Sequence, residues 1–108
     1  SIETYHLWRF NPRAKSFSEA EFPPAVKELQ LLWANPASLD GLPTMKHLET
    51  LEIHRCRNLT DVSLLPKVAP KLKRLIITTS KNVAPEEGIL NHPALRLAIL
   101  EGTKLIER

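Results

Sequence analysis

Residues 48–59, which read LETLEIHRCRNL, decide the fold. The first, fourth and sixth of these residues, Leu48, Leu51 and Ile53, are aliphatic, and apolar and polar residues alternate between the fourth and the sixth. Alternation with a period of two is typical of a short β-strand that buries one face. We therefore expect Leu51 and Ile53 to point into a core and Glu52 to point away from it.

The same pattern occurs five times along the chain, at intervals of 22 to 24 residues. The five blocks begin near Ile2, Val26, Leu48, Leu72 and Leu95. A regular period of this length indicates stacked structural repeats. Strands of successive repeats are then expected to pair in parallel, about 4.8 Å apart, and to share one continuous core.

This pattern resembles the leucine-rich-repeat (LRR) family, whose unit reads L-x-x-L-x-L-x-x-N/C-x-L. The resemblance covers residues 2–105. At the ninth position, where the family has Asn or Cys, only Cys56 matches, so the chain resembles an irregular, degenerate member. The resemblance implies an α/β leucine-rich-repeat solenoid with about five short parallel strands and irregular or short-helical segments on the convex side. We read residues 1–108 as a single domain of this kind.

The sequences between the expected strands predict only short helices or turns. All nine prolines fall in these intervals or at their edges, where a missing N–H does least harm. Residues 16–22 allow one helical turn capped by Ser16 or Ser18. Asp61 begins a second short turn that Pro66 is expected to end, and Pro85 resembles a helix start. No helix longer than about ten residues is expected.

Composition and charge narrow the class of protein. Among 108 residues, 43% are hydrophobic and 25% are charged, which is typical of a globular domain. The net charge of +3 permits an acidic partner but does not require nucleic acid. A single cysteine excludes an intrachain disulfide framework and favours a cytoplasmic location, and no apolar run is long enough for a membrane span.

The sequence predicts no enzyme. It has no phosphate-binding loop, no zinc motif and no dinucleotide fingerprint, so we expect no cofactor, no metal and no catalytic residue. Cys56 and His54 together invite a nucleophile interpretation. Since Cys56 occupies the position at which the repeat turns, a structural role is favoured.

The family resemblance implies that partners bind on the concave face, formed by repeat positions three, five, seven and eight. The partner-binding residues expected there are Trp8, Arg9, Leu32, Trp33, Glu52, His54, Arg55, Arg74 and Ile76. Trp33 is expected to lie between Arg9 and Arg55, which favours a cation–π contact. In the alternative interpretation, Trp8 and Trp33 fold under the irregular segments and belong to the core.

These features favour a non-catalytic module that binds a partner protein. Its setting stays open: a small bacterial immunity or inhibitor protein that neutralises a toxin, or the substrate-recognition part of a ubiquitin-ligase subunit or immune receptor. Residues 51–65, which read LEIHRCRNLTDVSLL, resemble the cysteine-bearing repeats of the F-box group. Nucleic-acid binding through Arg9, Arg55 and Arg74 is a less favoured alternative.

The two ends of the expected solenoid show no polar capping unit. Apolar residues such as Leu7 and Leu105 stand close to the ends of the sequence. Solenoids need polar end units for solubility. Either the chain is a fragment of a longer solenoid, or a partner or a second copy of the chain covers an end, which allows a homodimer.

Overall fold

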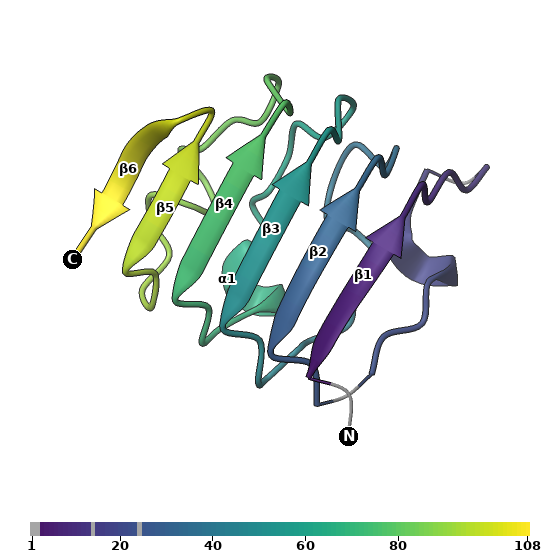
Figure 1. Cartoon of the computed structure of the whole chain (residues 1–108), viewed down its shortest axis with the longest axis horizontal. Helices are drawn as coiled ribbons and strands as arrows, with labels where there is room; N and C mark the ends of the chain where they lie inside the picture. Colours follow the sequence, from purple (N-terminus) through teal and green to yellow (C-terminus); the bar gives the residue numbers. More distant parts are fainter. Residues whose placement is uncertain (1–2, 14, 24) are drawn as a thin grey trace.

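Six strands form one sheet in the computed structural model, which describes residues 3–13, 15–23 and 25–108 (Figure 1). The first five strands pair in parallel in the order of the sequence, and the sixth runs antiparallel to the fifth. The strands are β1 (Thr4–Trp8), β2 (Glu28–Leu32), β3 (Thr50–His54), β4 (Arg74–Thr78), β5 (Leu97–Leu100) and β6 (Thr103–Glu107). The chain is a repeat solenoid with this sheet along one side.

The register of the strands confirms the alignment of the repeats. Leu51 in β3 lies opposite Leu29 in β2 and Leu75 in β4. A shift of one residue would turn every apolar side chain to the other face, so these apolar positions fix the register. Ile2, the expected start of the first repeat, lies outside the described residues, but β1 pairs in the expected register from Thr4 onward.

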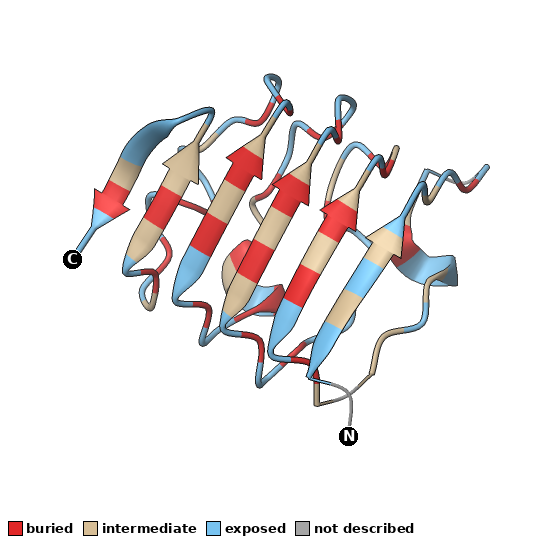
Figure 2. Cartoon of the chain, in the orientation of Figure 1, coloured by how far each residue is buried: buried red, intermediate tan, exposed pale blue. Residues whose placement is uncertain are grey.

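The core lies between the sheet and the segments that return behind it (Figure 2). Leu29, Leu51 and Leu75 are at most 2% exposed, whereas the residues that alternate with them are intermediate or exposed. Burying a leucine side chain completely contributes about 1.5–3 kcal/mol. The stacked leucines of successive repeats therefore hold the strands together.

Aromatic side chains cover the core beside β1. Phe10 stacks on the buried Phe17 with ring centres 5.6 Å apart, and Tyr5 contacts Phe22 edge to face at the same distance. Phe17 and Phe22 belong to the segment that returns from β1. These two contacts extend the core behind the edge strand β1.

The returning segments hold less helix than an α/β fold implies. The described residues contain one 3₁₀ turn, η1 (Phe17–Glu19), and one short helix, α1 (Leu65–Val68). The Ser16 side chain caps η1 by accepting the Ser18 N–H, as predicted. We expected Pro66 to end a helix, and this prediction is wrong. Pro66 lies in the first turn of α1, where its missing N–H leaves no bond unmade.

The segment that follows Pro85 is also not a helix: residues 86–91 form successive hydrogen-bonded turns.

A second, smaller ladder on this side of the solenoid consists of isolated parallel bridges from Ser38 to Asp61 and from Asp61 to Ala84. The returning segments are therefore held to one another by backbone bonds rather than by helix packing.

Strand β6 was not predicted by the repeat pattern. Glu101 and Gly102 both have positive φ, +49° and +81°, and form the tight turn that reverses the chain after β5. Positive φ is favoured by glycine and typical of hairpin turns. Ile106 of β6 then pairs with Ala98 and is 7% exposed. Thr103, expected to be the ninth residue of a fifth repeat, instead begins an antiparallel strand.

Glu101 also closes the row of turns at the carboxyl ends of the strands. In the first three repeats, the N–H after each strand donates to the last carbonyl of the next strand, as Arg55 does to Thr78 at 3.0 Å. In the fourth repeat, the Glu101 carboxylate replaces that carbonyl and accepts the N–H groups of Thr79 and Ser80, each at 2.8 Å. Glu101 thus completes the row of turns, β6 is the last strand of the sheet, and a homodimer through the ends of the solenoid stays a prediction.

His92 is a buried, neutral histidine in the last returning segment. It is 1% exposed, and its Nε2 lies 2.8 Å from the Ala69 carbonyl oxygen while its Nδ1 accepts the Ala94 N–H at 3.1 Å. A carbonyl only accepts and an N–H only donates, so these partners require the proton on Nε2 alone. Burial lowers the pKa of His92 below its usual 6.5; the bond to Ala69 opposes this effect and the positive charge of Arg108 adds to it.

Replacing Glu101 with alanine should lower the free energy of unfolding by about 1–3 kcal/mol, since two N–H groups lose a charged acceptor. Urea unfolding measures the change. The control is Glu107→Ala, which removes an exposed carboxylate of the same hairpin whose ion pair is with Lys104. Equal losses for the two variants would show that Glu101 is an ordinary surface acid.

The stability of the protein should fall as pH drops below about 6.5. In this range the unfolded chain binds a proton at position 92 that the folded protein resists, so acid favours unfolding until the lower folded pKa is passed. Urea midpoints measured from pH 7.5 to pH 5 test this. His92→Gln should flatten the slope and the exposed-residue control His47→Gln should keep it; the reverse result would place the titrating group elsewhere.

Candidate functional site

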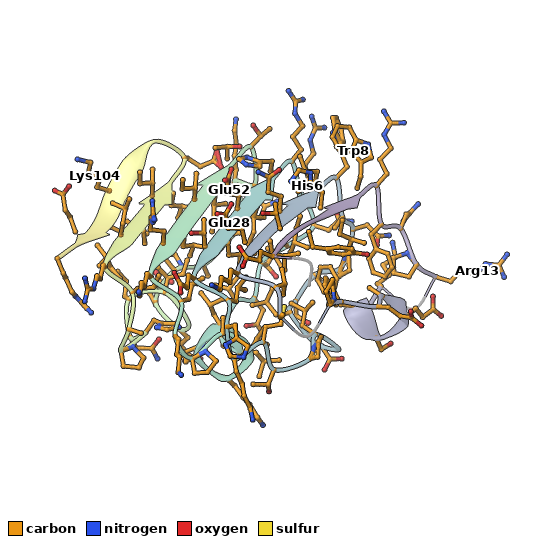
Figure 3. All side chains as sticks on the ribbon, turned by 60° about the horizontal axis from the view of Figure 1, so that its bottom comes forward. His6, Trp8, Arg13, Glu28, Glu52 and Lys104 are labelled. Carbon is orange, nitrogen blue, oxygen red and sulfur yellow. The ribbon has the colours of Figure 1, made fainter. Side chains whose placement is uncertain are left out.

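The nine predicted partner-binding residues share one surface. The face of the sheet that points away from the core, here called the open face, carries His6 and Trp8 of β1, Glu28 of β2 and Glu52 of β3 (Figure 3). The rim at the carboxyl ends of β1 to β4, here called the carboxyl edge, carries the residues that end or follow these strands. All nine residues lie on the open face or at the carboxyl edge.

The two tryptophans lie exposed at the carboxyl edge. Trp8 is 58% and Trp33 is 40% exposed. The Cζ atom of Arg55 lies 5.0 Å from the centre of the Trp33 ring, within the range of a cation–π interaction. The alternative in which both tryptophans belong to the core is therefore wrong. Of the two arginines expected beside Trp33, Arg55 makes the contact.

Four residues of the carboxyl edge share an unusual backbone conformation. Arg9, Trp33, Arg55 and Thr79 have φ between +50° and +59°. The left-handed region costs a non-glycine residue roughly 1–2 kcal/mol, and such outliers cluster at functional sites. The shared conformation places these side chains in one row along the rim, in the eighth position of each repeat.

A chain of polar contacts crosses the middle of the open face. Gln30 Nε2 donates to Glu52 Oε2 at 3.4 Å, Glu52 Oε1 lies 2.8 Å from His54 Nε2, and His54 Nδ1 lies 2.6 Å from the Thr78 hydroxyl. These contacts connect β2, β3 and β4 through side chains. Glu52 and His54, predicted as contact residues, therefore bind each other and hold this face in a fixed arrangement.

The two predicted residues in β4 lie apart from the tryptophans. Arg74 is the first residue of β4, so four residues, or about 13 Å at 3.3 Å per residue, separate it from the carboxyl edge. Ile76 lies opposite Ile99 of β5 and is half-buried with it. The structure thus does not bring Arg74 to Arg9 and Arg55, and it joins Ile76 to a small apolar area instead.

Two cations of the carboxyl edge were missed by sequence reasoning. Arg57 and Lys81 line a pocket of about 310 Å³ together with Thr79 and Asn82, and the Asn82 side chain donates to the Arg57 carbonyl at 2.9 Å. Both cations occupy the tenth position of their repeats. The signal was in the sequence: a comparison of the tenth position across the repeats, like the one made for the third, fifth, seventh and eighth positions, could have found them.

Cys56 is placed as a structural residue. Its side chain is 2% exposed, and its Sγ lies 3.7 Å from the Leu31 carbonyl oxygen and 3.6 Å from that of His54. Burial raises the pKa of the Cys56 thiol, so the group stays protonated. The imidazole of His54 is directed to Glu52 and Thr78 rather than to the thiol. A nucleophilic role for Cys56 has no geometric basis.

Metal-ligand clusters and membrane-spanning helices are both missing from the described ranges 3–13, 15–23 and 25–108. No three His, Cys, Asp or Glu side chains among them are grouped so as to hold a metal ion. No helix within the same ranges has the length and apolar character needed to cross a bilayer.

Replacing Arg55 with glycine should leave the free energy of unfolding within about 1 kcal/mol of the wild type. Glycine relieves the left-handed backbone cost, which offsets the loss of a cation–π contact worth about 0.5–1 kcal/mol. Thr50→Gly, in the extended backbone of β3, is the control and should destabilise more. A larger loss at Arg55, measured by urea unfolding, would assign Arg55 to the folding of the repeat.

The candidate site is therefore the carboxyl edge, with Trp8, Arg9, Trp33 and Arg55 at its centre and the open face beside it. No family model matches the sequence, no curated protein is similar to it, and no solved structure matches the fold. Any function must be argued from the chemistry of this surface.

Proposed function

We propose that this chain is a non-catalytic protein-interaction module, a degenerate relative of the leucine-rich-repeat class, that binds a partner protein through its carboxyl edge and open face. The observation that carries the proposal is the exposed Trp33 ring with Arg55 above it. Tryptophan and arginine are the residue types most enriched in interface hot spots.

The rigidity of the surface supports the same function. The core fixes the strands from behind, and the contacts from Gln30 through Glu52 and His54 to Thr78 fix side chains on the open face. A surface that is ordered before binding loses less conformational entropy on association. Such a module displays its contact residues in one arrangement rather than folding around its partner.

Several biological settings use a module of this kind. A toxin-neutralising inhibitor, a substrate-recognition segment of a ubiquitin ligase and the sensing part of an immune receptor all hold a partner protein without chemistry. Nucleic-acid binding by Arg9, Arg55 and Arg74 is less favoured, because Arg74 stands at the opposite end of its strand from the other two.

The test is a double variant, Trp33→Asn with Arg55→Asn, since asparagine tolerates positive φ and preserves the turn. The protein should stay folded by circular dichroism and should lose the partner that the wild type captures from an extract of its own cells, by quantitative mass spectrometry.

A matched control changes one apolar and one cationic residue on the returning segments. Leu90 is 45% exposed and Lys67 is exposed on α1, so Leu90→Asn with Lys67→Asn should leave capture unchanged. If the same proteins stay bound to both double variants, the carboxyl edge is not the binding surface.

A further inference from the structure

We infer that the carboxyl edge recognises an acidic segment of the partner protein. This inference rests on the proposed function and adds the chemistry of the partner. It starts from the cations of the edge, Arg9, Arg55, Arg57 and Lys81, which are all exposed.

The four cations of the carboxyl edge have no ion-pair partner among the described residues, as is also true of other exposed cations such as Arg13 and Lys67, but these four lie along the edge that carries the two exposed tryptophans. Elsewhere in the sheet, Lys27 pairs with Glu3 at 3.8 Å and Lys73 pairs with Glu49 at 4.0 Å. Within the ranges that the structure describes, no ion pair involves Arg9, Arg55, Arg57 or Lys81. An anionic partner would supply the missing countercharges.

The Glu101 carboxylate, which lies beside this row, binds backbone groups. Glu101 uses both of its oxygens on the N–H groups of Thr79 and Ser80. It therefore completes the turn of the fourth repeat rather than neutralising a neighbouring arginine.

The shape of the edge suits side chains that extend from a peptide. The pocket of about 310 Å³ is lined by Arg57 and Lys81 together with Thr79 and Asn82, so an acidic side chain that enters it comes near two cations. The Trp33 ring with Arg55 offers a flat surface for the peptide backbone or an apolar side chain. Guanidinium groups also bind carboxylates in two-point geometry, which gives direction as well as attraction.

The neighbouring open face favours a protein over a nucleic acid. Glu28 and Glu52 stand on it within the same repeats as the tryptophans and arginines (Figure 3). A phosphate backbone that left the carboxyl edge along β2 or β3 would meet these carboxylates. A protein segment can place acidic residues at the edge and polar or apolar residues on the open face.

The experiment selects peptides of 12 random residues, displayed on phage, against the immobilised wild-type chain. The enriched pool should contain at least a two-fold excess of Asp and Glu over the input. A synthetic copy of an enriched peptide should bind at least ten-fold more tightly than its Glu→Gln form. Fluorescence of Trp8 and Trp33 reports the binding directly, since these are the chain's two tryptophans.

Variants separate the edge from general charge effects. Arg55→Gln with Arg57→Gln should abolish binding of the acidic peptide, whereas Lys67→Gln with Lys71→Gln makes the same change in net charge away from the edge and should preserve it. Loss of binding in both variants, or in neither, would overturn the inference.

The remaining outcomes are also decisive. Enrichment of neutral or basic peptides that still require Trp33 would reject an acidic partner and leave the proposed function standing. No enrichment above background would reject the acidic segment. Tighter binding of single-stranded 12-nucleotide DNA or RNA at physiological salt, lost in the Arg55 and Arg57 variant, would reject both the acidic segment and the protein partner.

Discussion

The burial of one leucine from each of the three central repeats in a common column is the constraint on which the structure depends. Leu29, Leu51 and Leu75 fill equivalent places in adjacent strands. Once these side chains are buried, the pleat of each strand sends its neighbours in sequence to the opposite face. The same event that closes the core therefore decides which residues are offered to a partner.

Within each repeat, the positions that form the core differ from the positions that are exposed to a partner. The eighth position always takes a left-handed turn, and glycine or asparagine would adopt it at lower cost. Arginine or tryptophan stands there in the first three repeats. The left-handed backbone at this position favours glycine or asparagine, but the sequence has arginine or tryptophan. In natural sequences, such local conflicts are expected mainly at functional or strained sites.

Features that recur were predictable from the sequence, and features that break the recurrence were not. The parallel strands and their register follow from a pattern repeated five times, and the Arg55–Trp33 contact follows from that register. Strand β6 and the capping role of Glu101 arise where the repeat stops, so no other repeat reveals them, although Gly102 is a turn signal. The two hydrogen bonds of His92 depend on carbonyl and amide groups that only the folded chain brings together.

The first four repeats handle charge differently at the two ends of their strands. At the amino ends, the second repeat position alternates in sign through Glu3, Lys27, Glu49 and Lys73, and two ion pairs join adjacent repeats; Arg96 of the fifth repeat breaks this alternation. At the carboxyl edge, Trp33 separates Arg9 from Arg55 by two strand spacings, or about 10 Å, which is near the distance over which physiological salt screens charge. Spacing and an aromatic ring limit the repulsion there without removing the positive field. An edge of this kind is tolerated when the protein is alone and is stabilised when an anionic group binds.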